Sequence, residues 1–241
     1  RKMEILINGA AGRMGGTFIE YCEKNRISVV GKFDILTERL STFCKKADVL
    51  VDFSEKTAVK EITDFITAKK MPAVLAATGY ADNEISLIKK AAETVPVFLS
   101  ANLSLGAAFL LLSAKRAAKF FPDADIEIIE THHSRKKDSP SGTALLCFDF
   151  IKSVRPEARL SKDGGCRKKN EVGIHSLRLG DICGTHEVIF ATPSQTVTLR
   201  HSVNSRTAYA EGALAAAKFI IGKKSGLYGI EDLFGGDFGE I

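Results

Sequence analysis

The residues best suited to chemistry gather between Glu130 and Ala144. His132 and His133 stand side by side there, and an imidazole with an ordinary pKa of about 6.5 suits proton transfer near neutral pH. Lys136 follows, and its ammonium can pair with a carboxylate, or donate a proton where its surroundings lower its pKa. The segment therefore predicts a loop that holds a proton donor beside an anionic group.

The same loop runs into a helical pattern at Ala144, and Pro140 restricts its entry. Three residues before that helix offer hydroxyls or free N–H groups: Ser141, Gly142 and Thr143. Because a helix N-terminus favours negative charge, this end of the loop is predicted to seat a carboxylate. A solvated basic loop followed by a capped helix is the alternative that requires no ligand.

A zinc site is a second chemistry that the segment could support, with the histidine pair and either Asp138 or Glu130 as ligands. Adjacent residues at a strand end point to opposite sides, and no other His or Cys shows ligand spacing, so no metal is expected. Three further histidines lie on strand-like stretches and are expected to be structural: His175, His186 and His201.

A glycine-rich segment, Gly9–Gly15, directly follows the strand-like run Glu4–Asn8 and opens a helical pattern. Glycines there permit a tight turn and let backbone N–H groups approach a pyrophosphate at the helix N-terminus. Asp34 closes the second strand about 20 residues further on, where an acidic side chain would hold ribose hydroxyls. This context predicts a dinucleotide site, although a glycine-rich turn in an ordinary α/β domain is the simpler alternative.

From Met3 to Ser100, short β-rich apolar runs alternate with segments of helical period, which is typical of a parallel sheet covered by helices. The predicted strands are Glu4–Asn8, Ser28–Asp34, Val49–Phe53, Ala73–Ala77 and Val95–Ser100, and the predicted helices are Arg13–Lys24, Thr57–Lys69 and Asn83–Glu93. Pro96 favours an edge position for the last strand. This half is therefore expected to be α/β.

After Asn102 the pattern changes to a long helix over Leu105–Phe121 and a strand over Ile126–Glu130. Three further strand-like stretches follow the next helix: Val172–Leu179, His186–Ala191 and Thr196–Val203. No helical segment separates those three, so they are expected to be antiparallel neighbours. A last helix is predicted over Ala208–Ile221, and Lys162–Asn170 is expected to be a flexible loop.

The 241 residues have an average composition, with 45% hydrophobic and 26% charged residues and a formal net charge of +5. The longest apolar stretch, Gly106–Ala114, is far shorter than the about 20 residues that cross a bilayer, so no membrane association is expected. The basic residues lie in short scattered runs without a nucleic-acid-binding motif, which favours a small anionic ligand over a nucleic acid. The five cysteines lack Cys-x-x-Cys spacing and the N-terminal residues lack a secretory pattern, which indicates a reduced, cytoplasmic protein.

These motifs resemble those of the 4-hydroxy-tetrahydrodipicolinate reductases, or dihydrodipicolinate reductases, of the diaminopimelate route to lysine. Glu130–Ala144 matches the family pattern Glu-x-His-His-x-x-Lys-x-Asp-x-Pro-Ser-Gly-Thr-Ala at every fixed position. The resemblance extends over essentially the whole chain, through Gly9–Gly15, Val51–Ser54, Thr78–Gly79, Asn102, Ser104 and Ser205–Arg206. It implies an N-terminal Rossmann dinucleotide-binding domain, residues 1–103 and 206–241, and a mixed α+β domain for substrate binding and tetramerisation, residues 104–205.

The resemblance also implies hydride transfer from NADH or NADPH to a small cyclic dicarboxylate, giving tetrahydrodipicolinate, in a homotetramer. His132 matches the family's general acid, and Lys136 its catalytic or substrate-clamping lysine. The positions that match substrate-binding residues are His133, Ser141, Gly142, Thr143 and Thr78. The positions that match cofactor-binding segments are Gly9, Ala10, Ala11, Gly12, Arg13, Met14, Asp34, Ala76, Ala77, Thr78, Ser100, Ala101, Asn102 and Leu103.

Three positions depart from the family pattern. Ala76 stands where many members have glycine, which would be strained if a positive φ is needed, and Leu103 replaces a frequent phenylalanine. Ile35 follows Asp34, where members that accept NADPH often carry arginine. The cations left to bind a 2′-phosphate are Arg13, Lys32 and Arg39. NADH is therefore expected to be used at least as well as NADPH.

Two other functions stay open on the sequence. A homoserine or semialdehyde dehydrogenase could share the N-terminal half but would lack the Glu130–Ala144 pattern. The semialdehyde enzymes also need a nucleophilic cysteine in a polar loop, whereas Cys147 lies in an apolar helical segment. A non-catalytic dinucleotide-binding protein would not need both His132 and Lys136.

Overall fold

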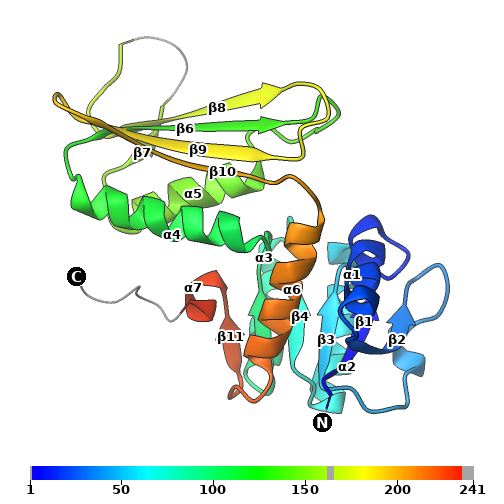
Figure 1. The fold of residues 1–241 in the computed structure, drawn as a ribbon. Helices are drawn as coiled ribbons and strands as arrows, with labels where there is room; N and C mark the ends of the chain where they lie inside the picture. Colours follow the sequence, from blue (N-terminus) through cyan, green and yellow to red (C-terminus); the bar gives the residue numbers. More distant parts are fainter. Residues whose placement is uncertain (1, 162–165, 235–241) are drawn as a thin grey trace. The chain divides into compact units, whose positions relative to one another are not determined.

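The computed structural model describes residues 2–161 and 166–234. The chain forms two compact units, one of Arg1–Ser104 with Arg206–Ile241 and the other of Leu105–Ser205 (Figure 1). Each unit has its own sheet and its own buried hydrophobic cluster. The second unit is thus an insertion in the sequence of the first.

The described part of the first unit contains a six-stranded sheet in the order β11-β5-β4-β3-β1-β2, with every strand pair parallel. Its strands are β1 (Glu4–Asn8), β2 (Ser28–Phe33), β3 (Val49–Asp52), β4 (Ala73–Leu75), β5 (Pro96–Leu99) and β11 (Gly226–Tyr228). β1, β3 and β4 are almost wholly buried, as strands covered by helices on both faces are, which explains the apolar runs at residues 5–7, 49–51 and 73–75. β2 lies on one side of β1, while β3, β4 and β5 follow one another on the other side, so the order of the strands changes direction between β1 and β3. Open α/β sheets bind ligands at such a position.

Helices and short 3₁₀ turns cover this sheet: α1 (Arg13–Lys24), η1 (Leu40–Thr42), η2 (Lys56–Ala58), α2 (Val59–Lys69), α3 (Asp82–Ala92), α6 (Thr207–Ile220) and α7 (Ile230–Leu233). α1 packs beside α6, and α2 beside α3. Leu6 and Leu50 of the sheet share one buried cluster with Ile62 of α2 and Ile88 of α3. The α/β prediction is confirmed, and each predicted element up to Ser100 ends within two residues of its observed bounds.

The prediction that Pro96 marks an edge strand is wrong. β11 pairs with β5, and Pro96 lies opposite Gly226, so β5 is an interior strand. Proline is tolerated there because it is the first residue of the strand. The three residues of β11 were not expected from the sequence, since so short a segment carries no periodic signal.

The described residues of the second unit form a five-stranded mixed sheet in the order β10-β9-β6-β8-β7, packed against two helices. Its elements are α4 (Leu105–Phe120), β6 (Asp125–His132), α5 (Gly142–Lys152), β7 (Arg159–Leu160), β8 (Glu171–Arg178), β9 (Thr185–Ala191) and β10 (Thr196–Ser202). Leu111 of α4 and Phe148 of α5 pack with Ile128 of β6 and Phe190 of β9. Figure 1 shows both helices along one face of this sheet.

The expectation of three consecutive antiparallel strands is only partly right. β9 and β10 are antiparallel neighbours, but β6 lies between β8 and β9 and pairs parallel with β8. The connection Leu179–Gly184 is longer than a tight hairpin needs, and its six residues suffice to cross one intervening strand, a span of about 10 Å. β6, which buries one of its two faces, thereby becomes the central strand of the unit.

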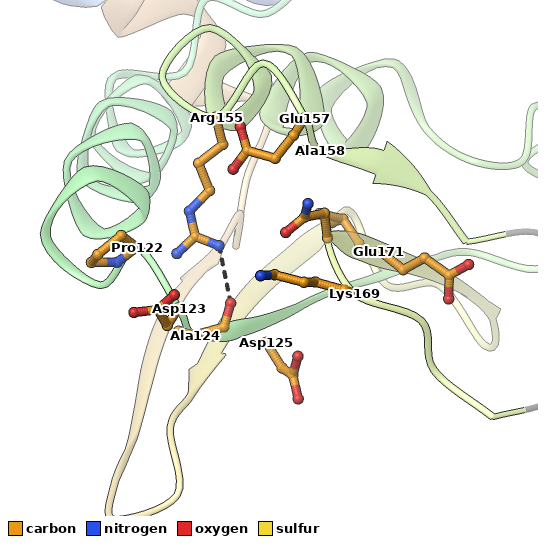
Figure 2. Close-up of a pocket in the computed structure, with 11 residues that line it drawn as sticks. Pro122, Asp123, Ala124, Asp125, Arg155, Glu157, Ala158, Lys169 and Glu171 are labelled. Atoms are coloured by element: carbon orange, nitrogen blue, oxygen red, sulfur yellow. Dashed lines mark hydrogen bonds between the residues drawn. The ribbon is translucent and has the colours of Figure 1, made fainter.

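Arg155 closes the C-terminal end of α4. Its guanidinium donates hydrogen bonds to the carbonyl oxygens of Ala118, at 2.9 Å, and Ala124, at 3.0 Å, beside a cavity of about 70 Å³ (Figure 2).

Of the loop predicted at Lys162–Asn170, residues 162–165 lie outside the described residues. In the rest of that loop, Arg167 forms an ion pair with Asp125 of β6 at 2.9 Å. None of the helices within residues 2–161 and 166–234 is long and apolar enough to cross a membrane.

Candidate active site

Strand β6 carries the side chains around which the site is built. Its buried positions form one row toward α4 and α5, which begins with Ile126 and Ile128 and ends with Glu130 and His132. Glu130 has no exposed surface and His132 is 8% exposed. A carboxylate at such a position costs several kcal/mol unless it is fully paired, so its partners define the site.

Glu130 accepts hydrogen bonds from four residues. Arg178 donates two, from Nη1 at 2.9 Å and Nη2 at 2.7 Å, and the backbone N–H of Ser141 donates a third at 3.1 Å. The Nδ1 atom of His132 lies 2.5 Å from Oε2. Burial by itself raises the pKa of Glu130, but the hydrogen bonds from Arg178, Ser176 and His132 lower that pKa to about 2. Glu130 is therefore an ionised carboxylate.

The contact with Glu130 assigns the proton of neutral His132 to Nδ1, because a carboxylate can only accept. Nε2 then carries the lone pair and faces Gly184, since a Cβ atom on that glycine would lie 3.1 Å from it. Burial lowers the pKa of His132, Glu130 raises it, and the charges of Lys136 and Arg178 lower it again. The net direction is downward, so the ring is neutral at neutral pH.

His186 and Ser141 complete the buried part of the site. The Nε2 atom of His186 lies 3.0 Å from Oγ of Ser141, and that hydroxyl also accepts the N–H of Ala144 at 3.2 Å, so Ser141 caps α5. The rings of His186 and His132 meet edge to face, 5.2 Å apart. Burial and the neighbouring His132 lower the pKa of His186 to about 4, so it too is neutral.

The loop between β6 and α5 places Lys136 near these rings. Its Nζ lies 2.8 Å from Oδ1 of Asp138, and its charge is close enough to lower the pKa of both His132 and His186. Burial raises the pKa of Asp138, but hydrogen bonds, above all the one from Lys136, and the charges of Lys136 and Arg178 together lower it. The lysine is thus an oriented cation, and 21% of its side chain is exposed.

The other predicted substrate-binding residues of this unit lie at the same end of β6. Gly142 is exposed as the first residue of α5, and Thr143 follows half-buried. His133 comes one residue after the buried His132, and its Nδ1 atom is buried without a hydrogen-bond partner among the described residues. Thr78, the remaining predicted substrate residue, lies exposed in the first unit.

Sequence reasoning missed part of this cluster. It did not select Arg178, considered Glu130 only as a metal ligand, and placed His186 among structural histidines. The signal available for Glu130 was its place two residues before His132 on an otherwise apolar strand face. Arg178 and His186 gave no such signal, because they come from other strands. No group of three or more His, Cys, Asp or Glu side chains that could hold a metal ion occurs in the described residues.

The predicted cofactor-binding segments of the first unit all follow strands of the parallel sheet. They come after β1 (Gly9–Met14), β2 (Asp34), β4 (Ala76–Thr78) and β5 (Ser100–Leu103). Because these strands are parallel, the four segments lie at one edge of the sheet, the carboxyl edge. Oδ2 of Asp34 accepts the N–H of Ala11 at 3.1 Å, so the acid and the glycine loop are in contact.

The geometry of the glycine loop fits a dinucleotide. Gly9 has a φ of +75°, and a Cβ atom there would lie 2.5 Å from the backbone nitrogen of Ser54. A Cβ atom on Gly15 would lie 2.1 Å from the carbonyl oxygen of Gly9, so α1 approaches the loop closely. The N-cap residue Gly12 provides no side-chain cap, and the first turn of α1 has no acidic residue. This helix N-terminus can therefore receive a pyrophosphate.

The structure accounts for the departure at Ala76, and at Leu103 it shows a close backbone contact with α6 but no reason for leucine in place of phenylalanine. Ala76 does not have a positive φ, so alanine causes no backbone strain there. Gly79 has the positive φ of that loop, at +74°. Leu103 is buried, and its carbonyl oxygen presses on Gly212 of α6, where a Cβ atom would lie 1.5 Å away. The glycine at position 212 is required by this contact.

Comparison with protein families agrees with the motifs of both units. The family model described as "Dihydrodipicolinate reductase, N-terminus" matches residues 3–103, and the one described as "Dihydrodipicolinate reductase, C-terminus" matches residues 106–234. The chain belongs to the dihydrodipicolinate reductase family. The resemblance read from the sequence is therefore confirmed.

Curated relatives in the dihydrodipicolinate reductase family match at nearly full length. The 4-hydroxy-tetrahydrodipicolinate reductase of Caldanaerobacter subterraneus subsp. tengcongensis is 41% identical, covering 96% of this chain and 98% of its own. That of Clostridium tetani is 38% identical, covering 95% and 96%. That of Rickettsia bellii is 35% identical, covering 96% and 94%.

Solved structures show the same fold. A dipicolinate-bound dihydrodipicolinate reductase from Paenisporosarcina sp. TG-14 matches with a TM-score of 0.81 and 24% identity, covering 96% of this chain and 99% of that one. Aspartate semialdehyde dehydrogenase II from Vibrio cholerae matches less closely, with a TM-score of 0.56 and 10% identity, covering 90% and 98%. The nucleophilic thiol of such a dehydrogenase is not found at Cys147, which is buried and whose pKa burial raises to about 12.

As a member of the dihydrodipicolinate reductase family, the chain is an oxidoreductase of lysine biosynthesis with 4-hydroxy-tetrahydrodipicolinate reductase activity. His132, Lys136 and Ser141 lie together in its second unit, whereas Thr78 and the cofactor segments lie in its first unit.

Proposed function

We propose that His132 delivers the proton of the reduction, and that Lys136 and the N-terminus of α5 hold the carboxylates of a small dicarboxylate substrate. The observation that carries this proposal is the 2.5 Å contact between Nδ1 of His132 and Glu130. It occupies one ring nitrogen and leaves Nε2 as the nitrogen available to a substrate.

Reduction of a C=N bond requires a hydride at carbon and a proton at nitrogen. Bound NADH or NADPH supplies the hydride. His132 is neutral in the free protein, because burial and the nearby cations lower its pKa. A dianionic substrate beside the ring favours the imidazolium form, so His132 takes up a proton at Nε2 as substrate binds and passes it to the substrate nitrogen. The ring then returns to the Nδ1–H tautomer held by Glu130.

The carboxylate-binding roles follow from charge and hydrogen-bond donors. Lys136 is oriented by Asp138 and offers an ammonium near His132. The first residues of α5, Gly142 and Thr143, offer backbone N–H groups at the positive end of the helix. A dicarboxylate can engage the two together, which places its ring nitrogen near His132.

A coupled assay tests these roles. The purified chain is supplied with pyruvate, aspartate semialdehyde and the preceding synthase, and NADH oxidation is followed. His132→Gln should lower kcat by at least about 100-fold, because it removes the proton donor while keeping a polar side chain. Lys136→Ala should raise KM as well as lower kcat. Near wild-type rates in either variant would show that its assigned role is wrong.

NADH is proposed to be used at least as well as NADPH. The carboxylate of Asp34 already accepts the N–H groups of Ala11 and Leu36, at 3.1 and 3.0 Å, and would repel a 2′-phosphate. Ile35 supplies no cation, and Lys32 is paired with Glu23 at 3.2 Å. A kcat/KM tenfold or more higher with NADPH than with NADH would overturn this preference.

The first unit is proposed to bind the dinucleotide and the second the dicarboxylate, within a homotetramer. The face of the second sheet opposite α4 and α5 carries Ile129, Ile189 and Leu177, none of them fully buried. The same face also carries Glu127, His175 and Glu187, and a half-exposed face that mixes apolar and charged side chains suits a contact between subunits. Light scattering should give about four times the chain mass of 26.1 kDa. Ile129→Asp should yield smaller species, and a monomeric wild type would refute the assembly.

A further inference from the structure

Glu130 and Arg178 form an ion pair beneath the proposed proton donor, with Glu130 fully buried and 19% of the Arg178 side chain exposed. We propose that these two are positioning residues of the reductase site. Their ion pair holds the His132 ring and the carboxylate-binding N-terminus of α5 at a fixed position relative to each other. The inference rests on the proposed role of His132. It adds two residues that act through His132, the N-terminus of α5 and the Lys136 loop.

Glu130 joins two functional parts of the site through one carboxylate. Oε2 contacts the His132 ring at 2.5 Å, while Oε1 accepts the N–H of Ser141, the N-cap of α5, at 3.1 Å. A shift of the carboxylate would therefore move the donor nitrogen and the helix N-terminus together. A side chain that served stability alone would need only its pairing with Arg178.

Arg178 extends the same network to the lysine loop. Besides its two bonds to Glu130, Nη2 donates to the backbone carbonyl of Asp138 at 2.6 Å, and Asp138 holds Lys136 through its side chain. Arg178 lies directly opposite His132 in the β6–β8 ladder, so sheet register brings the guanidinium to this point. Only a planar guanidinium can make all these contacts at once; lysine cannot.

The charged and titratable groups that face His132 come from every strand and loop around it. They are Glu130 on β6, Lys136 in the following loop, Arg178 on β8 and His186 on β9. Glu130 is the only anion among these four, and it favours the protonated ring. Replacing it with glutamine removes that influence at constant size, so the ring loses its proton at a lower pH.

The test compares Glu130→Gln and Arg178→Lys with wild type in the full chain, using the pH dependence of kcat/KM and calorimetric binding of dipicolinate. Glu130→Gln should lower kcat by about 10- to 100-fold and move the alkaline limb of the profile about one pH unit lower. Arg178→Lys should weaken dipicolinate binding about tenfold, because the Lys136 loop loses its hydrogen bond.

Glu127→Gln is the matched control. Glu127 lies on the same strand, on the opposite face, and contacts a histidine as Glu130 does, with 2.7 Å to Nε2 of His175. In preparations of equal oligomeric state it should leave the pH profile and dipicolinate affinity within about twofold of wild type.

The result for Glu130→Gln decides whether the pair has more than a structural role. A Glu130→Gln enzyme that loses only thermal stability and keeps the wild-type profile would overturn the inference. If Glu130→Gln does not fold, Arg178→Lys decides alone: wild-type dipicolinate affinity and kcat would overturn it. Retained turnover in His132→Gln would instead contradict the proposed function on which the inference rests.

Discussion

A single added methyl group at position 184 should slow the reaction without unfolding the protein. Gly184 lies against the His132 ring, and a Cβ atom there would stand 3.1 Å from Nε2 and 3.3 Å from Cδ2. Ordinary contact between such atoms is about 3.5 Å, so the ring must retreat by a few tenths of an ångström. It cannot retreat freely, because Glu130 holds Nδ1 at 2.5 Å and the His186 ring packs 5.2 Å away.

The size of the effect follows from how steeply catalysis depends on position. A misplacement of 1 Å can cost about 100-fold, so a few tenths of an ångström should cost about tenfold in kcat, or about 1.4 kcal/mol of barrier. Gly184 does not have a positive φ, so alanine adds no backbone strain there. Steady-state kinetics with saturating NADH should therefore show the loss in kcat, with the melting temperature nearly unchanged.

Gly180→Ala is the matched comparison from the same loop. A Cβ atom at Gly180 meets nothing within 4 Å, but the φ of +53° strains any other residue. This variant should lose about 1 kcal/mol of stability and much less activity than Gly184→Ala. If Gly184→Ala instead kept kcat within about twofold of wild type, Nε2 of His132 would not be the nitrogen that serves the reaction.

Three further predictions concern the fold, the cofactor and acid stability. In urea denaturation, Gly212→Ala should lower the free energy of unfolding by about 3 kcal/mol, because its Cβ would overlap the Leu103 carbonyl oxygen. Gly16→Ala is the control: its Cβ has open space around it, so the free energy of unfolding should be unchanged or up to about 1 kcal/mol higher. Equal effects of the two variants would contradict the packing. Ile35→Arg should raise the NADPH to NADH ratio of kcat/KM about tenfold, and an unchanged ratio would place the 2′ position elsewhere. The pKa of Glu130 is lowered from 4.5 to about 2, so its ionised form contributes about 3 kcal/mol to the free energy of unfolding. That contribution is present above pH 4.5 and is lost as the pH falls toward 2. Urea titrations of Glu130→Gln should therefore decline less steeply than those of wild type over that range, and parallel curves would refute the shift.

Most of the first unit could be predicted from the sequence because its physics is local. A buried parallel strand such as β3 begins with a continuous apolar run at residues 49–51, and the glycines at 9 and 15 stand where the backbone makes close contacts. The pairing of β8 with β6 could not be predicted, since a strand's partner is set by long-range packing rather than by its own pattern. The short β11 exists only through its pairing with β5.

The site divides in the same way. His132, Lys136 and Ser141 could be selected because one loop carries them in a distinctive order. Ser176 and His186 reach Glu130 only because the β6 ladders place them directly opposite it, on two different neighbouring strands. Arg178 arrives through the same register, 48 residues along the chain from Glu130. Spacing along the chain contains no information about such cross-strand neighbours.

The single-turnover rate of NADH oxidation in His132→Gln tests the central claim most directly, because it isolates the reduction from product release. Enzyme loaded with NADH is mixed with excess substrate, and dipicolinate binding to the same preparation shows that the site is intact. We expect the rate to fall at least about 100-fold while dipicolinate affinity stays within about threefold of wild type. A rate within about twofold of wild type would contradict the assignment of His132 as the proton donor.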